Sequence, residues 1–378
     1  MRNTMKNNRI FLEKLLDGAE VEWKPLGKVT DIKTGQSVSK NIIAQNPGIY
    51  PVINSGREPL GFINVWNTEN DPIGITTRGA GVGSITWQEG KYFRGNLNYS
   101  VTIKSEYELN VRFLYHMLLH FQKEIHNLCS FTGIPALNAS ELKKLEIPIP
   151  PLPVQTEIVK ILDALTALTS ELTSELILRR KQYEYYRERL LSEEELGKVG
   201  FEWRTLGEVT NIKTGQAVSK YSISQNPGIY PVINSGREPL GFINEWNTEN
   251  DPIGITTRGA GVGSITWQEG KYFRGNLNYS VTIKSDCRLN IRFLYHILLH
   301  FQKEIHNLCS FTGIPALNAS ELKKLEISIP AIEEQHRIVS ILDKFETLTN
   351  SITEGLPLAI GQSQKRYEYY RELLLNFS

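Results

Sequence analysis

The chain has 378 residues, of which 40% are hydrophobic and 22% charged, and its formal net charge is +1. These values predict two or three folded domains and exclude a disordered chain or one that is basic throughout. No apolar run approaches the 18 residues of a membrane span, and the first eight residues lack the apolar core of a signal peptide. Three cysteines without paired spacing predict reduced thiols, so we expect a soluble, cytoplasmic protein.

The chain contains an internal repeat. Residues 21–150 align with 201–330 without a gap and differ at 16 of 130 positions, and residues 66–105 are identical to 246–285. The repeat is far longer than a solenoid unit and has the size of one domain. It predicts five parts: an N-terminal segment (1–20), a first domain (21–150), a central helix with a linker (151–200), a second domain (201–330) and a C-terminal helix (331–378).

The first half of each repeat is predicted to be rich in strands. A short helix is expected at 9–18, before the repeat begins, and residues 21–29 enter the domain as a strand. Residues 30–104 then alternate short runs rich in Val, Ile, Tyr and Thr with turns rich in Gly and Asn, which is typical of short strands. The predicted strands are residues 49–56, 61–63, 73–77, 84–87 and 99–103.

The second half of each repeat is predicted to be helical. Apolar residues at helical spacing predict one helix over 110–128, and a second, short helix is expected to begin at Asn138 or Ser140. Strands followed by helices within one repeat predict a mixed α/β (α+β) domain, present twice.

A long amphipathic helix is predicted after each repeat. Leucines and isoleucines recur at steps of three and four residues from about residue 154, and the same pattern returns at about 333–375. Gly355 and Pro357 interrupt the second pattern and predict a kink or a break there.

The two long helices are expected to pair with each other. Both end in Tyr-Glu-Tyr-Tyr-Arg-Glu, at 183–188 and 367–372. Because an apolar seam needs a partner, we predict an antiparallel coiled coil with a pseudo-two-fold axis. The predicted seam residues are Leu165, Leu168, Leu172, Leu176, Tyr183, Tyr186, Ile341, Leu342, Leu348, Tyr367 and Tyr370.

Three motifs connect the chain to a known family. Thr-Gly-Ile-Pro-Ala-Leu-Asn occurs at 132–138 and 312–318, Ile-Pro-Ile-Pro-Pro-Leu at 147–152, and Gln-x-x-Ile-Val-x-Ile-Leu-Asp at 155–163 and 335–343. With these motifs in place, essentially the whole chain resembles the specificity (S) subunit of a type I restriction-modification system.

The resemblance implies a non-catalytic subunit that recognises DNA. Each target-recognition domain would read half of a bipartite, gapped site in double-stranded DNA, and the helices would separate the domains and bind two modification subunits. The modification subunits would use S-adenosylmethionine to methylate adenine, and a restriction subunit would use ATP and Mg²⁺, so no cofactor is expected on this chain. The free subunit could also self-associate through its apolar helix faces.

Five of the eight candidates for DNA contact in the first domain lie in a basic, glycine-rich stretch. Residues 75–104 carry four Lys or Arg against one Glu. Arg can bind guanine and Asn adenine through paired hydrogen bonds, whereas Lys33 and Lys91 would suit phosphate. The alternative is that Asn96 and Asn98 cap turns while Tyr92 and Phe93 fill the core. The candidates are Lys33, Ser55, Arg57, Arg78, Lys91, Arg94, Asn96 and Asn98 in the first domain, and Lys213, Ser235, Arg237, Arg258, Lys271, Arg274, Asn276 and Asn278 in the second.

The near-identity of the repeats predicts the symmetry of the DNA site. Two equal readers inverted by a two-fold axis would contact a half-site and its reverse complement, that is, a gapped inverted repeat. The tandem units Thr169–Leu172 and Thr173–Leu176, both Thr-Ser-Glu-Leu, resemble the spacer repeats of the family, and the alternative is a leucine-rich coil that repeats by chance.

Two other functions remain as alternatives. One is an assembly scaffold with little DNA affinity of its own. The other is a self-contained Mg-dependent endonuclease, suggested only by Asp71, Glu89 and Lys91.

Gly79–Gly83 has no following helix and so does not predict a nucleotide loop, and the chain lacks the Asn/Asp-Pro-Pro-Tyr/Phe motif of adenine methyltransferases. Three histidines of the predicted helix lack ligand partners at suitable spacing and predict no metal site: His116, His120 and His126.

Overall fold

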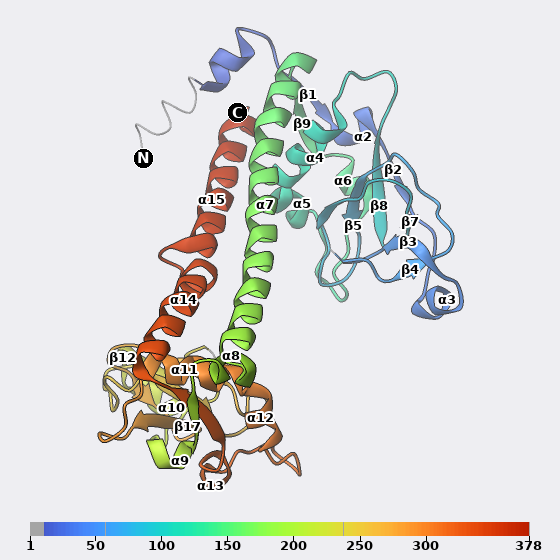
Figure 1. The fold of residues 1–378 in the computed structure, drawn as a ribbon. Coiled ribbons are helices and arrows are strands. Elements are labelled where there is room, and N and C mark those ends of the chain that lie inside the picture. Colours follow the sequence, from blue (N-terminus) through green and yellow to red (C-terminus); the bar gives the residue numbers. More distant parts are fainter. Residues whose placement is uncertain (1–10, 57, 237, 378) are drawn as a thin grey trace. The chain divides into compact units, whose positions relative to one another are not determined.

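The computed structural model describes residues 11–56, 58–236 and 238–377. The chain forms two compact units, one drawn from residues up to Leu172 and from Ile360 onward, the other from Thr173–Ala359. Each unit therefore combines one sequence repeat with two segments of long helix (Figure 1). None of the helices among the described residues is long and apolar enough to cross a bilayer.

The first domain is built from short strands followed by short helices. Of the helix expected at 9–18, residues 11–16 are helical, and 9 and 10 lie outside the described residues. The elements are β1 (Glu22–Pro25), α2 (Leu26–Val29), β2 (Thr30–Thr34), α3 (Lys40–Gln45), β3 (Pro47–Ile53), β4 (Phe62–Ile63), β5 (Ile73–Thr76), β6 (Ile85–Trp87), β7 (Phe93–Arg94), β8 (Asn98–Ile103), α4 (Val111–His120), α5 (Gln122–Asn127), α6 (Ala139–Leu142) and β9 (Glu146–Ile149).

The second domain repeats this series element by element. Its elements are β10 (Phe201–Thr205), α9 (Leu206–Val209), β11 (Thr210–Thr214), α10 (Lys220–Gln225), β12 (Pro227–Ile233), β13 (Phe242–Ile243), β14 (Ile253–Thr256), β15 (Ile265–Trp267), β16 (Phe273–Arg274), β17 (Asn278–Ile283), α11 (Ile291–His300), α12 (Gln302–Asn307), α13 (Ala319–Leu322) and β18 (Glu326–Pro330). The predicted mixed α/β class and the duplication are both confirmed.

The core of each domain lies between an antiparallel sheet and one helix. Strands β2, β8, β5 and β6 form the sheet in that order, and its isoleucines and valines pack against α4. Asn110 is the N-cap of helix α4, and its side chain accepts hydrogen bonds from the Arg112 and Phe113 amides. Phe113 and Leu114, on the inner face of α4, are completely buried.

A second, smaller sheet has its own core. The strand order of this sheet is β4–β3–β7, and β3 pairs with β7 in parallel. Ile43, Val52, Ile63 and Phe93 pack together on this sheet. The predicted strands at 49–56, 61–63, 73–77, 84–87 and 99–103 correspond to β3, β4, β5, β6 and β8, with shifted ends.

The prediction of one helix over 110–128 was wrong. The helix is divided at Phe121, where the backbone (φ −82°, ψ 18°) leaves the helical region and α5 begins at Gln122. The Gln122 side chain donates to the Gly83 carbonyl, which is a tertiary contact that the helical pattern of the sequence cannot show.

The long helices differ from each other in continuity. Helix α7 runs unbroken over Leu152–Leu190, is followed by α8 (Glu193–Gly197), and contributes to both units. The second long helix is split into α14 (Ile332–Asn350) and α15 (Gly355–Leu375), as the glycine and proline there predicted. Gly355 has a φ of +79°, and a Cβ on it would lie 2.6 Å from the Thr347 carbonyl oxygen, so glycine is required at this break.

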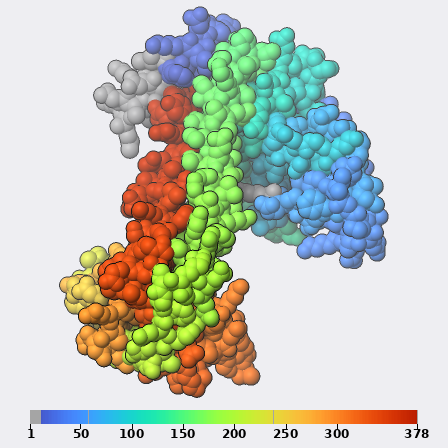
Figure 2. All heavy atoms as spheres, viewed as in Figure 1, coloured from blue at the N-terminus to red at the C-terminus, as the bar shows by residue number. Residues whose placement is uncertain are grey.

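Within each unit the two helix segments run in opposite directions. In the first unit the Thr169 and Ser363 hydroxyls are 2.8 Å apart, and Leu374 shares a core with Ile158, so the red segment of α15 follows α7 in Figure 2. In the second unit Tyr186 stacks on Phe345 with ring centres 5.4 Å apart, and the Arg180 guanidinium lies 3.5 Å from the Thr349 carbonyl. These contacts agree with antiparallel pairing, and a coiled coil along the full helices stays a prediction.

Candidate nucleic-acid interface

Several turns of the first domain meet at one place. Gln36, after β2, forms a bridge with Gly95, whose amide donates to the Ile53 carbonyl at 2.7 Å. The Thr77 amide, after β5, donates to the Leu97 carbonyl at 2.9 Å. The turns joined in this way carry three of the predicted contact residues: Ser55, Arg78 and Asn96.

Most of the predicted basic contacts point to solvent. Lys33 and Arg78 are exposed, and Lys91 is exposed beside Trp66, with its ammonium 4.6 Å from the ring centre and 3.9 Å from a Glu69 oxygen. The counterparts in the second domain are also exposed: Lys213, Arg258 and Lys271. Arg57 and Arg237 lie outside the described residues.

Arg94 and Asn98 are buried, so the prediction that they contact bases is corrected. The Arg94 side chain lies in the core at 3% exposure, and its guanidinium donates to the carbonyls of Asp71, Ile73 and Tyr99 at 2.7–3.1 Å and to the Asn98 side chain at 2.6 Å. Because these guanidinium N–H groups already donate to acceptors inside the protein, they cannot also bind the edge of a base. The same correction applies in the second domain to Arg274 and Asn278.

The buried arginine is part of a structural network. Burial lowers the pKa of Arg94, while the neighbouring Tyr92 and Asp71 oppose that shift. Tyr92 and Phe93 are both buried, which confirms the alternative that these two aromatic residues fill the core. The network joins β7 to β5 and β8 and so fixes the turns on which the exposed candidates lie.

A shallow polar cavity lies beside the buried arginine in each domain. It measures about 310 Å³ in the first domain and about 290 Å³ in the second. Its lining includes the carboxylates of Glu69 and Asp71, in addition to amide and hydroxyl groups. Two carboxylates make this cavity a poor site for phosphate, so the exposed turns are the better candidates for DNA contact.

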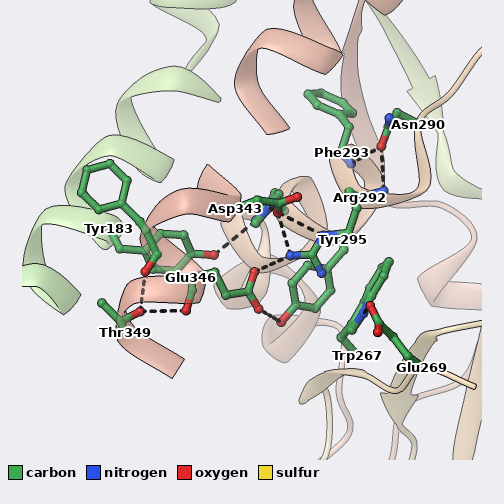
Figure 3. A network of polar contacts seen from close by, with 12 residues as sticks. Tyr183, Trp267, Glu269, Asn290, Arg292, Phe293, Tyr295, Asp343, Glu346 and Thr349 are labelled. Carbon is green, nitrogen blue, oxygen red and sulfur yellow. Dashed lines mark hydrogen bonds and ion pairs between the residues drawn. The ribbon is translucent and has the colours of Figure 1, made fainter. Parts of the chain in front are cut away.

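A second polar network holds each domain against the long helices. In the second unit Arg292 of α11 donates to Asp343 and Glu346 of α14 at 2.7 Å each, and His296 lies 2.8 Å from Asp343 (Figure 3). The Tyr183 hydroxyl, from α7, is 3.2 Å from the other ring nitrogen of His296. One face of α11 is thus bonded to both helix segments of its unit.

The first unit repeats this network with its own residues. Arg112 lies 2.8 Å from Asp163, and His116 bridges Asp163 at 2.7 Å and the Tyr367 hydroxyl of α15 at 3.2 Å. The sequence did not predict this role for His116. The signal was present, because Asp163 and Asp343 end the shared Ile-Leu-Asp motif and the two tyrosines open the shared Tyr-Glu-Tyr-Tyr-Arg-Glu.

One group in this network has the composition of a metal site. Among the described residues, His296, Asp343 and Glu346 bring their ligand atoms within 4.8 Å of one another. The Arg292 guanidinium already supplies the cation between the two carboxylates. Burial favours a higher pKa for Asp343, but hydrogen bonds from His296 and Arg292 outweigh it and keep that pKa below its ordinary value. The group is therefore an ion-pair network joining helices.

The comparison with known proteins agrees with the resemblance seen in the sequence. The family model for the type I restriction modification DNA specificity domain matches residues 19–179 and 198–362. The chain belongs to this family. It is the specificity subunit of a type I restriction-modification system, a recognition component and not a catalytic one, as the sequence predicted.

Three related proteins match over at least 97% of their own length. A putative type I restriction enzyme specificity subunit of Haemophilus influenzae is 42% identical over 99% of this chain and 100% of its own. The specificity subunit of the EcoR124I/EcoR124II type I restriction enzyme of Escherichia coli is 34% identical over 97% of both chains. The crystal structure of a type I system S subunit from M. genitalium has a TM-score of 0.66 at 23% identity and covers 96% of this chain and 98% of that one, which shows a shared fold.

Proposed function

We propose that this specificity subunit reads a bipartite, gapped site in double-stranded DNA and binds two modification subunits that methylate adenine, with a restriction subunit completing the assembly. The observation that carries the proposal is the duplication of a whole reading domain inside a family defined by DNA specificity. Exposed Arg and Lys side chains on turns of both domains supply the cations that DNA binding requires.

We further propose that the two half-sites are equal and inverted. Every exposed candidate of the first domain has the same residue in the second, and residues 66–105 and 246–285 are identical. Equal readers presented in opposite orientations contact a half-site and its reverse complement, because the symmetry of a DNA site mirrors that of the protein. We expect half-sites of about 3–4 base pairs whose centres lie about one helical turn apart.

The test is the methylation pattern that this subunit directs when it is co-expressed with its modification subunit. Every methylated adenine in the host genome would be mapped, with an empty-vector strain as control. A gapped inverted repeat methylated in both halves is the expected result.

Other patterns would change the proposal in defined ways. An asymmetric gapped motif would retain the reading function and refute the equality of the half-sites. If no motif appears, although the same modification subunit is active with another specificity subunit, the chain is an assembly scaffold with little DNA affinity.

A further inference from the structure

Two loops of each domain are joined into one projection. The loop of residues 77–84 follows β5, and the loop of residues 130–137 lies between α5 and α6; we call them the paired loops. The Gly79 amide donates to the Pro135 carbonyl at 2.9 Å, and the Leu137 amide donates to the Thr77 carbonyl at 2.8 Å. The second loop is also closed on itself, because Ser130 and Ala136 exchange backbone hydrogen bonds of 2.8 and 3.0 Å. Backbone bonding therefore fixes the base of the projection.

The tip of this projection carries two large apolar side chains in solvent. Phe131 is 53% and Ile134 67% exposed, and the Gly133 between them has a φ of +87° with open space around it. The Phe131 ring contacts the ring of His126, itself exposed, with centres 4.9 Å apart. The second domain presents the same tip, with Phe311 at 53% and Ile314 at 69%.

The charge of the paired loops themselves suits a polyanion as their partner. Arg78 is the one charged residue in the sequence of the paired loops, and neither loop contains a carboxylate. Arg78 is exposed and forms a bridge with Ala136 of the partner loop. A Cβ on Gly81 would lie 3.2 Å from the Ser55 carbonyl, so the projection stands directly beside the turns that carry the candidate DNA contacts.

An apolar tip beside a cation fits a particular way of binding duplex DNA. Apolar side chains such as Phe and Ile can enter the minor groove, partly unstack one base step and bend the duplex, while neighbouring cations hold the phosphates. A rigid base suits this role, because a wedge must keep its position while it separates stacked bases.

We propose that Phe131 and Ile134, with Phe311 and Ile314 in the second domain, form an apolar wedge that inserts at a base step in or next to each half-site. This proposal rests on the proposed reading of DNA. The wedge would make recognition depend on how easily that step unstacks, in addition to the base contacts of the neighbouring turns.

The test compares two variants of the full chain, each assembled with its modification subunits. In the wedge variant the four tip residues are changed: Phe131→Ala, Ile134→Ala, Phe311→Ala and Ile314→Ala. The matched control carries Phe62→Ala and Phe242→Ala, since these phenylalanines are also 53% exposed but lie on β4 and β13. The DNA is a duplex with the site found by methylation mapping, in which 2-aminopurine replaces one base at a time, away from the methylated adenine.

With the original chain, we expect fluorescence to rise at one step in each half of the site. The wedge variant should lose this rise and bind the duplex about tenfold more weakly or worse, since contact between a base and an aromatic side chain contributes that much. The control variant should keep both the fluorescence rise and the affinity for the duplex.

Three results would overturn the wedge. A wedge variant with unchanged affinity and fluorescence would refute the wedge and leave the proposed reading of DNA intact. A folded wedge variant that no longer binds modification subunits would show that the tip is a protein contact. If the original chain binds no duplex, both the proposed DNA reading and the wedge fail.

Discussion

Arg94 and Arg78 show how burial separates two arginines that look alike in the sequence. Both lie in the basic, glycine-rich stretch, yet Arg94 donates to carbonyls inside the domain while Arg78 stands exposed on a loop. The first is a structural residue, and the second is a candidate for DNA contact.

Replacing Arg94 should destabilise the first domain. Arg94→Met leaves the Asp71 and Ile73 carbonyls without their guanidinium donor and removes the ion pair of 3.7 Å with the Asp71 carboxylate, and loss of one partner of a buried ion pair costs about 3–5 kcal/mol. Thermal unfolding of the full chain would measure the change. Arg78→Met is the matched control and should shift the free energy of unfolding by no more than about 0.5 kcal/mol. Equal losses in the two variants would contradict the assignment.

Replacing the exposed arginines should weaken DNA binding without loss of stability. Arg78→Ala combined with Arg258→Ala is expected to cost about 1–3 kcal/mol of binding free energy for each half-site. Equilibrium binding to the mapped site at fixed salt would measure it. Relaxed preference at one base position would indicate a base contact, and a uniform loss with a smaller salt dependence would indicate a phosphate contact. Full affinity in the double variant would exclude Arg78 from the interface.

His116 predicts a pH dependence of stability. Burial lowers the pKa of His116, against the opposing effect of Asp163, and burial lowers the pKa of His120 as well. Below pH of about 6.5 the unfolded chain binds protons that the folded chain does not, so the free energy of unfolding should fall as the pH drops, by up to about 1.4 kcal/mol per pH unit for each group. Urea unfolding between pH 7.5 and 5.5 would show it, and His116→Gln should reduce the slope. An unchanged slope would argue against this role of His116.

At the scale of elements, the two long helices have different designs. Helix α7 is continuous, whereas α14 and α15 are separated by a break that ends at Gly355. The boundary between the compact units falls at Leu172, between the two Thr-Ser-Glu-Leu units of α7. Adding or removing a Thr-Ser-Glu-Leu repeat would therefore change the length of α7 between the part that belongs to the first compact unit and the part that belongs to the second.

A third Thr-Ser-Glu-Leu unit inserted after Leu176 should lengthen the gap of the DNA site and leave the half-sites unchanged. Four helical residues add about 6 Å and exceed one turn by only about 40°, so the apolar face is nearly preserved. That length corresponds to one or two base-pair steps of about 3.4 Å. Methylation mapping of the insertion variant would read the gap. A control that keeps the length, Ser170→Ala with Ser174→Ala, should methylate the original motif. An unchanged gap after insertion would favour a chance repeat.

At the scale of the whole molecule, each compact unit is completed by a segment from another part of the chain. Tyr367, from the C-terminal helix, bonds to the first domain, and Tyr183, from the helix that follows the first domain, bonds to the second. Each repeat thus meets the same two kinds of helix segment, which is the structural basis for treating the domains as equivalent readers.

Making the two domains identical should not change the DNA site. A chain in which residues 201–330 are replaced by the sequence of 21–150 removes the 16 differences and retains every exposed candidate contact. We expect it to direct methylation of the same motif, because under the proposed function equal readers contact equal half-sites. The reciprocal chain, with 201–330 in both places, is the control. A changed motif in either chain would place specificity in the 16 differing positions.

The sequence by itself determined the duplication, the mixed α/β class, the long helices and the break near Gly355, because repetition, apolar periodicity and backbone restrictions are local properties. It could also identify the family, since the Thr-Gly-Ile-Pro and Gln-x-x-Ile-Val motifs are contiguous. Only the tertiary structure decided which polar residues reach solvent. Arg94 and Asn98 are as polar as Arg78 and Asn96, but both are buried, and Arg94 donates to the carbonyls of Ile73 and Asp71, which lie 21 and 23 residues away in the chain.

The same reason explains the remaining differences between prediction and structure. The helix over 110–128 is divided at Phe121, next to the Gln122 side chain that donates to the Gly83 carbonyl. His116 connects two helices because α15 lies against the first domain. The exposure of Phe131 was also not predicted from the sequence, in which Thr-Gly-Ile-Pro was recognised only as a family motif. All three features involve contacts between distant segments, and periodicity along one segment contains no information about its partner.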